Sequence, residues 1–361
     1  MNRFNSAGTM ETSNRNRESL VSVIVVNYNG EQWLRACIGA LLADSDAVQE
    51  IIVVDNASTD DSSRILREIA TEHPEVRVLS SEANLGYAGA VNLALATASA
   101  KYLAIMNMDI TVEPGWLKPL IAFLDQTPDA GAVNPVIMLP DGSRINAAGL
   151  DVHVTGLGFT RGLWSPVAGL DPSPVRVSGI SGAVFVMRRQ LLDQIGGMDS
   201  SGFLYHEDVN LSWLLHMAGF YLYCVPESRV RHDYSLTMYP AKLYLLERNR
   251  WAMLLTYLRP MTLVLLSPLL IITEMVMWCY CILRGWSFVR SKFESYRWVA
   301  GMLGTIQKRR QSTESARKVS DWEVIRKLKW GYAWKQLLAI GRERGMSRRQ
   351  VTRGLSTEHF D

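Results

Sequence analysis

The stretch Lys101-Tyr-Leu-Ala-Ile-Met-Asn-Met-Asp109 decides the fold and also points to a site. Residues 102–106 form an apolar run of buried-strand length, which stops on Asn107-Met108-Asp109. A carboxylate just past the carboxyl end of a buried strand lies at the mouth of an open α/β sheet, where such sheets bind ligands. A ligand held through a divalent cation needs an acid at that place. The alternative is that Asp109 only caps the turn that leads into Glu113-Pro114-Gly115.

Strands alternate with helices along the first third of the chain. Short apolar runs are typical of buried parallel strands, and we predict strands at 21–26, 51–54, 76–79 and 102–106. Apolar residues at helical spacing predict the intervening helices at 31–42, 62–71 and 90–97. This alternation predicts an α/β fold with a doubly wound, mostly parallel sheet and right-handed crossovers.

The pattern becomes irregular from Gly131, where glycines punctuate loops or short strands. Beyond this region we predict strands at 177–187 and 221–225, with helices at 190–195 and 208–218.

Acidic residues stand at three places where chemistry is expected. Asp55 and Asp109 each follow a predicted strand, so they should converge on one edge of the sheet. The pair Glu207-Asp208 stands at the start of a predicted helix. Asp208 could simply be an N-cap that satisfies free N–H groups, although glycines at 196, 197 and 202 favour a shaped loop.

Charge is distributed unevenly along the 361 residues, although the net charge is only +3. Residues 284–361 hold 18 Lys and Arg against 7 Asp and Glu, whereas the rest of the chain holds 20 against 28. A basic tail behind an acidic front predicts that the tail meets an anionic partner. Residues 1–20 are polar and lack the apolar core of a secretion signal, so we interpret them as a disordered leader.

Residues 261–283 form an apolar segment that is long enough to cross a bilayer, with Glu274 as its one charge. A single crossing would put the basic tail and the acidic front on opposite sides, and the positive-inside tendency would then place the acidic front outside, without a signal sequence. We therefore favour a re-entrant or in-plane arrangement with both halves in the cytosol. The alternative is a buried helix of a soluble protein. Trp and Tyr mixed with Lys and Arg after residue 285 suit a membrane interface, and no nucleic-acid module accompanies them.

Six segments occur in the order and spacing of one known family. They are 21–30, 54–60, 84–92, 107–109, 181–188 and 196–219. Over roughly residues 20–260 the chain resembles the inverting family 2 glycosyltransferases, which have the GT-A fold, and it is most similar to rhamnosyltransferase-like bacterial members. The resemblance implies a transferase domain over 21–257, followed at 258–361 by the apolar segment and a basic helical, membrane-associated tail.

The resemblance also implies roles for individual residues. It implies that the donor nucleotide is contacted by Asn27, Tyr28, Asp55, Asn84, Gly86, Asn107 and Asp109. Asp109 matches the last acid of the family's metal-binding Asp-x-Asp, where this chain has Asn107 in the first position. Asp109 and His232 would then hold a divalent cation, Mg²⁺ or Mn²⁺, with one acid fewer than many relatives have.

Asp208 matches the family's catalytic base, and Glu207 would orient Asp208 or the acceptor. An inverting transfer is a single displacement, so one carboxylate must deprotonate the acceptor hydroxyl. Arg231, Arg248 and Arg250 are candidates for phosphate contact, or surface charges.

The implied donor is a nucleoside diphosphate sugar, with dTDP-rhamnose favoured over UDP- and GDP-sugars. The implied acceptor is a lipid-linked glycan or polysaccharide in bacterial surface glycan synthesis, at the cytoplasmic face of the inner membrane. No nucleic-acid partner is expected.

Other classes compete with this interpretation. A sugar-nucleotide pyrophosphorylase needs a glycine-rich loop with a basic residue after the first strand, where this chain has Asn27-Tyr-Asn-Gly30. A dehydrogenase is disfavoured because no G-x-G-x-x-G follows that strand. A third alternative is a degenerate, non-catalytic membrane scaffold, which the neutral Asn107 favours. The presence of Asp55, Asp109 and Asp208 argues against it.

Overall fold

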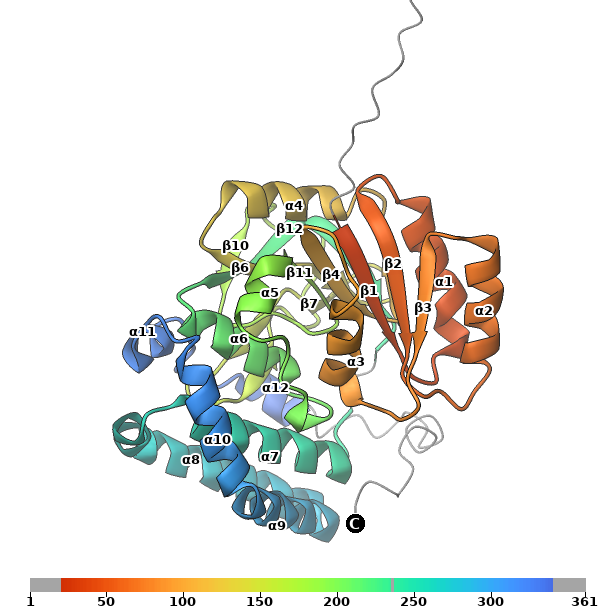
Figure 1. Ribbon diagram of the computed structural model, residues 1–361. Coiled ribbons are helices and arrows are strands. Elements are labelled where there is room, and N and C mark those ends of the chain that lie inside the picture. Colours follow the sequence, from red (N-terminus) through yellow and green to blue (C-terminus); the bar gives the residue numbers. More distant parts are fainter. Residues whose placement is uncertain (1–20, 235–236, 340–361) are drawn as a thin grey trace, which may run out of the picture.

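The computed structural model of the chain describes residues 21–234 and 237–339. The proposed leader at 1–20 and the end of the basic tail lie outside the described residues. A mixed sheet forms the centre of the molecule, with its main path ordered β10-β12-β6-β11-β4-β1-β2-β3 (Figure 1). Its strands are β1 (Val21–Asn27), β2 (Val48–Asp55), β3 (Val76–Ser80), β4 (Tyr102–Asn107), β5 (Ile110–Val112), β6 (Ala130–Met138), β7 (Ile145–Ala147), β10 (Val175–Val177), β11 (Val184–Arg188) and β12 (Tyr221–His232).

The first four long strands are parallel, which confirms the predicted α/β fold class. Their register sets polar residues side by side where the strands end, with Asn27 opposite Asp55 and Val26 opposite Asn107. Helices α1 (Glu31–Ala43), α2 (Ser62–Glu72) and α4 (Leu117–Gln126) cover one face of the sheet. The other face is covered by α3 (Gly86–Leu95), α5 (Arg189–Gln194) and α6 (Glu207–Met217).

Several predicted boundaries in the chain are wrong, among them the strand predicted at 221–225, which continues to His232 as β12. The region from Gly131 contains β6, a fully buried nine-residue strand parallel to β12, because its small and β-branched residues fill the sheet centre. The strand predicted over 177–187 is two strands, β10 and β11, with the loop 178–183 between them. Helix α3 begins at Gly86 rather than residue 90. A separate hairpin, β8 (Leu150–Val152) and β9 (Gly158–Thr160), lies in the irregular region.

The chain after β12 forms a helical layer that lies together below the sheet in Figure 1. Its helices are α7 (Pro240–Tyr257), α8 (Pro260–Arg284), α9 (Trp286–Gly301) and α10 (Leu303–Glu314). The later helices α11 (Asp321–Ile325) and α12 (Trp334–Ala339) follow them. One apolar cluster combines Trp213 of α6 with Tyr257 of α7, Leu266 of α8 and Val324 of α11, so the layer packs directly on the α/β part.

Helix α8 is the one helix among the described residues that is long and apolar enough to cross a membrane. One side of α8 is buried against the protein along several turns, through Leu266, Leu270, Thr273, Met277 and Cys281. Its other side exposes large apolar side chains, which include Met261, Val264, Leu265, Ile271, Ile272, Met275, Ile282 and Leu283.

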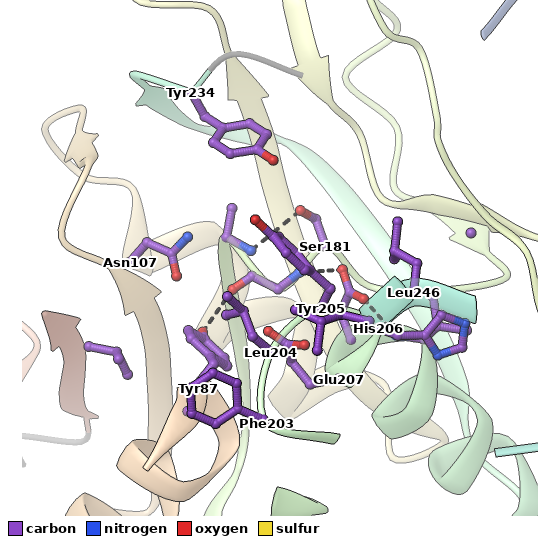
Figure 2. Close-up of a pocket in the computed structure, with 18 of the residues that line it drawn as sticks. Tyr87, Asn107, Ser181, Phe203, Leu204, Tyr205, His206, Glu207, Tyr234 and Leu246 are labelled. Atoms are coloured by element: carbon purple, nitrogen blue, oxygen red, sulfur yellow. Dashed lines mark hydrogen bonds between the residues drawn. The ribbon is translucent and has the colours of Figure 1, made fainter. Parts of the chain in front are cut away.

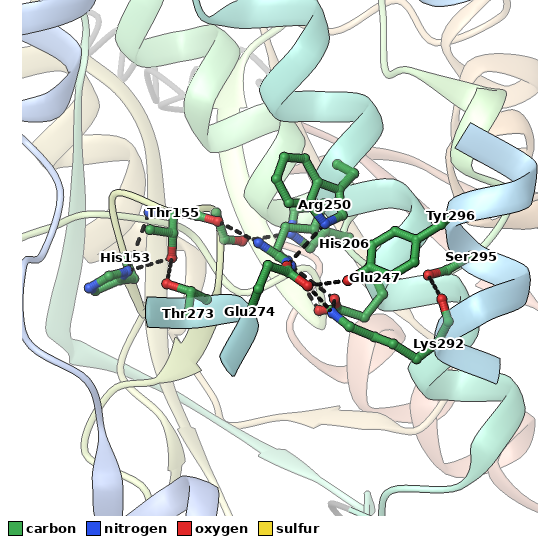
Figure 3. Close-up of polar contacts among 12 residues, drawn as sticks. His153, Thr155, His206, Glu247, Arg250, Thr273, Glu274, Lys292, Ser295 and Tyr296 are labelled. Atoms are coloured by element: carbon green, nitrogen blue, oxygen red, sulfur yellow. Dashed lines mark hydrogen bonds and ion pairs between the residues drawn. The ribbon is translucent and has the colours of Figure 1, made fainter. Parts of the chain in front are cut away.

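The single charge of the apolar segment, Glu274, belongs to a cluster of buried charges (Figure 3). Arg250 of α7 pairs with Glu247, at 2.9 Å, and with Glu274. Lys292 of α9, which is fully buried, pairs with Glu247 and lies 2.8 Å from Glu274. Burial alone would raise the pKa of Glu247, but the charges of Arg250 and Lys292 outweigh it and lower that pKa to about 2. The cluster, defined by these four residues, joins α7, α8 and α9.

Lys292→Met should lower the free energy of unfolding by about 3–5 kcal/mol, because Arg250 alone then faces the two carboxylates Glu247 and Glu274 and a buried negative charge is left uncompensated. The matched control is Arg290→Met, which removes an exposed pair with Glu294 on the same helix and should cost less than about 1 kcal/mol. Urea denaturation of both variants measures the difference. Equal costs would show that the buried cluster does not hold the helical layer.

Candidate active site

A cavity of about 670 Å³ opens at the carboxyl ends of β1 and β4 and at the start of α6. Figure 2 shows Glu207 and Tyr87 on one side of it and Tyr234 on the other. Eight of the ten predicted site residues line this cavity. They are Tyr28, Asn84, Gly86, Asn107, Asp109, Glu207, Asp208 and His232. The structure therefore brings together residues that lie up to two hundred positions apart in the sequence.

Glu207 and Asp208 form the first turn of α6, at the positive end of the helix dipole. The Oδ2 of Asp208 accepts a hydrogen bond from the Gly182 amide at 3.2 Å, and its Oδ1 accepts one from the Val209 amide at 2.8 Å. Burial raises the pKa of Asp208. Burial and the charge of Asp208 raise the pKa of Glu207 to about 8. Near neutral pH, Glu207 thus keeps its proton and Asp208 is the better candidate for a carboxylate base.

The loop in front of α6 has an unusual backbone. Phe203, Tyr205 and His206 all adopt positive φ, between 63° and 73°. Such conformations persist only where neighbouring contacts hold them, and they gather at functional sites. His206 is buried, and burial lowers its pKa to about 4, so it is neutral at the N-terminus of α6. The loop delivers the two carboxylates into the cavity.

Asp109 and His232 face each other across the cavity wall. The Oδ1 of Asp109 lies 3.2 Å from the Nε2 of His232, and neither atom has a hydrogen-bond partner among the described residues. The Nδ1 of His232 contacts the Oδ1 of Asn146 at 3.2 Å. Because an amide oxygen only accepts, this contact calls for a proton on Nδ1, and it leaves Nε2 facing Asp109.

The Asp109 oxygen and the His232 nitrogen at this separation need either a proton or a cation between them. A carboxylate together with an imidazole nitrogen is a pair of ligands that fits a divalent cation. No group of three or more His, Cys, Asp or Glu side chains is arranged around a metal position within 21–234 and 237–339. A cation here would therefore take its remaining ligands from Asn107, from water or from a bound ligand.

Asn27 and Asp55, both predicted to contact the nucleotide, do not line the cavity and are buried behind it. Asn27 donates to Asp55 at 3.3 Å and to the Ser58 hydroxyl at 3.1 Å. Asp55 in turn accepts from the Ser58 amide at 3.3 Å. The pair thus supports the loop after β2. Asn27 and Asp55 lie opposite each other at the ends of paired strands, so their side chains bond to each other and do not reach into the cavity.

Gly86 lines the cavity, although its close approach is to the loop before α6. A Cβ at this position would lie 2.0 Å from the Phe203 carbonyl oxygen, and the φ of +70° also favours glycine. The adjacent Tyr87 amide donates to the same carbonyl at 3.1 Å. Glycine at 86 therefore lets α3 and the strained loop meet.

Of the three arginines considered for phosphate contact, only Arg248 lines the cavity. Arg250 is buried in the charge cluster, and Arg231 pairs with Glu113 outside the cavity, so neither is placed for phosphate contact. Arg248 lines the cavity and stacks on Tyr244 and Trp298 at 4.9 and 4.6 Å.

Sequence reasoning missed several residues of the cavity wall. Tyr87 donates its hydroxyl to the Gly182 carbonyl at 2.8 Å, and it belongs to a predicted turn where only Asn84 and Gly86 carried a role. Tyr205, Tyr234 and Tyr244 also line the cavity. Tyr87 and Tyr244 lie on helices, and Tyr205 and Tyr234 lie on loops. No shared spacing or motif connects the four, so only the fold reveals them.

Comparison with known proteins relates part of this chain, and its fold, to glycosyltransferases. Residues 22–196 match the profile of glycosyl transferase family 2. The chain is 29% identical over 235 residues to N-acetylglucosaminyl-diphospho-decaprenol L-rhamnosyltransferase of Mycobacterium tuberculosis, a match that covers 59% of this chain and 76% of that protein. It is 27% identical over 224 residues to the O-antigen biosynthesis protein RfbC of Myxococcus xanthus, covering 60% of this chain and 17% of that one.

Among solved structures, the crystal structure of GalNAc-T7 with UDP, GalNAc and Mn²⁺ superposes with a TM-score of 0.55. It is 19% identical to this chain, and the match covers 66% of this chain and 48% of GalNAc-T7. At that identity the likeness concerns the fold. The profile match shows a glycosyl transferase family 2 region at residues 22–196, and the chain has a GT-A fold.

Proposed function

We propose that the chain is an inverting glycosyltransferase that moves a sugar from a nucleoside diphosphate sugar to a lipid-linked or polysaccharide acceptor in bacterial surface glycan synthesis. The observation that carries the proposal is one cavity lined both by Asp208 and by the facing pair Asp109 and His232. Rhamnose is the favoured sugar because the mycobacterial relative is a rhamnosyltransferase. The proposed donor is thus dTDP-rhamnose, ahead of UDP- and GDP-sugars.

The chain's own residues divide the work in this proposal. Tyr28, Asn84 and Asn107 line the side on which we place the nucleotide. Asp208 removes the proton from the acceptor hydroxyl as that oxygen attacks the anomeric carbon. The amides of Gly182 and Val209 orient the Asp208 carboxylate for this step. Glu207 orients the acceptor.

Asp109 and His232 are the residues we expect to hold a divalent cation, Mg²⁺ or Mn²⁺. When bound, such a cation supplies positive charge next to the diphosphate that leaves. Asn107 should weaken the binding of this cation, because it is a neutral side chain at a position where an acid would add a charged ligand.

We place the protein at the cytoplasmic face of the inner membrane, with the catalytic domain at 21–257 and a membrane-associated part at 258–361. The exposed apolar side of α8 supports this placement. The buried side of α8 and the pairing of Glu274 favour a helix that lies in the membrane plane, since a spanning helix would have to give up both. An acceptor carried on a lipid would then be near the enzyme.

Asp208→Asn should lower kcat roughly 10²–10⁴-fold, because the amide cannot accept the proton of the acceptor. The Kd of the nucleoside diphosphate should stay within about twofold, since Asp208 is placed on the acceptor side. Transfer assays with dTDP-rhamnose and titration calorimetry with dTDP measure the two quantities.

Glu207→Gln is the matched comparison and should cost less, because Glu207 with a pKa of about 8 already carries a proton at pH 7. Near-normal transfer by Asp208→Asn would refute the base assignment. A wild type that neither transfers nor hydrolyses any nucleotide sugar would favour the scaffold alternative.

The dependence of nucleotide binding on a metal ion can be measured through the melting temperature, without an activity assay. A nucleoside diphosphate with Mn²⁺ should raise the melting temperature of the wild type, since ligand at 100 times its Kd stabilises by about 2.7 kcal/mol. Chelator or Asp109→Ala should remove most of that rise. Glu113→Gln, at a half-buried carboxylate just beyond β5, should not remove it. A rise that is insensitive to chelator would refute the cation.

Leu265→Glu should weaken vesicle binding at least about tenfold, because burying one leucine side chain contributes about 1.5–3 kcal/mol. Co-sedimentation with phosphatidylglycerol and phosphatidylethanolamine vesicles measures the binding. Leu85→Glu, at an exposed leucine before α3, should bind as the wild type does. Equal binding by all three proteins would remove α8 from the membrane contact.

A further inference from the structure

We propose that Asn249 of α7 is a positioning residue that holds the strained loop 202–206, and with it Asp208, in the geometry that transfer requires. The inference rests on the proposed role of Asp208 as base. No periodicity or motif in the sequence singled out Asn249, and its side chain does not line the cavity. Its role follows from what it bonds.

The strained backbone of the loop 202–206 must be held in place by surrounding contacts. Of the six non-glycine residues with positive φ in the described part of the chain, three are Phe203, Tyr205 and His206. Each such residue costs of order 1–3 kcal/mol. A relaxed loop would carry Glu207 and Asp208 with it, since His206 is directly before the first turn of α6.

Asn249 supplies that support with one side-chain nitrogen. Its Nδ2 lies 2.9 Å from the carbonyl oxygen of Gly202, 3.1 Å from that of Leu204 and 2.8 Å from that of Tyr205. An amide nitrogen has two hydrogens, so three carbonyls share them. The side chain is only 7% exposed, which removes water as a substitute donor. The carbonyl oxygens of three loop residues therefore converge on one nitrogen atom.

Glycine at 202 makes this approach possible. A Cβ there would lie 3.0 Å from Asn249 Nδ2 and 3.2 Å from its Cγ, so any side chain would press on the amide. Arg248, next to Asn249, adds a hydrogen bond from its Nη2 to the same Gly202 carbonyl at 3.2 Å.

The other end of the loop is held from two more helices. Asp199 accepts from the Ser201 amide and from the side chain of Asn210 on α6, both at 3.1 Å. It also pairs with Arg309 of α10, whose side chain is largely buried. The loop is thus fastened to α6, α7 and α10, and Asn249 makes none of its contacts with Tyr28, Asn84 or Asn107 on the proposed nucleotide side.

This arrangement predicts a specific kinetic signature. Asn249→Ala and Asn249→Asp should both lower kcat about 100-fold, since a displacement near 1 Å of a reacting group costs that much. The donor KM and the Kd of dTDP should stay within about twofold. Asn249→Asp keeps the volume, loses the donors and sets a carboxylate against the three carbonyl oxygens, so its kcat should fall at least as far as that of Asn249→Ala.

Ser228→Ala is the matched control, since it removes a buried side-chain to backbone hydrogen bond of 2.6 Å to Trp116, away from the cavity. It should lose stability and keep kcat. Gly202→Ala approaches the same contact from the loop and should reproduce the fall in kcat if the Asn249 variants do not fold.

Two results would overturn the proposal: kcat within threefold of wild type in the Asn249 and Gly202 variants, or an equal fall in Ser228→Ala. If the wild type transfers no sugar, the proposed function fails and the positioning role is judged by hydrogen exchange. Amides of residues 202–207 should then exchange at least tenfold faster in Asn249→Ala than in the wild type, and unchanged exchange would refute the contact.

Discussion

The buried charges of Glu247, Arg250, Glu274 and Lys292 are the constraint on which the helical layer depends. Two carboxylates and two cations leave no net charge inside, so the group is stable only when all four partners are present. Because Glu274 is the one charge in the apolar segment, its pairing fixes which side of α8 faces the protein. The opposite side is then left apolar and exposed.

Helix α7 connects this cluster to the cavity. Glu247 and Arg250 bond toward α8 and α9, whereas Tyr244 and Arg248 line the cavity. Asn249, between them in sequence, bonds to the loop before Asp208. The proposed catalytic base is therefore held by the same helix that holds the proposed membrane-facing helix. This shared support gives a physical reason for the long helical region behind a GT-A domain.

The sequence predicts the first half of the sheet well, because buried parallel strands are continuous apolar runs and Asn107-Met108-Asp109 ends one of them. It predicts β6 poorly, because Gly131, Asn134 and Pro135 interrupt the apolar pattern that is typical of a strand. The stability of β6 comes from neighbouring strands that are far along the chain. Asp109, Glu207, Asp208 and His232 could be named from motifs. Their meeting in one cavity depends on the fold, as does the finding that Asn27 and Asp55 bond to each other behind it. Asn249 gave no sequence signal, because its partners are backbone carbonyls.

The central claim is a single displacement with Asp208 as base, and the stereochemistry of the product tests it most directly. Proton NMR of the first product formed from a nucleoside diphosphate sugar gives the configuration at the anomeric carbon. We expect a configuration opposite to that of the donor, because one attack from the face opposite the leaving diphosphate inverts the centre. A product with the donor's configuration would refute the single displacement, since retention requires a different use of these carboxylates.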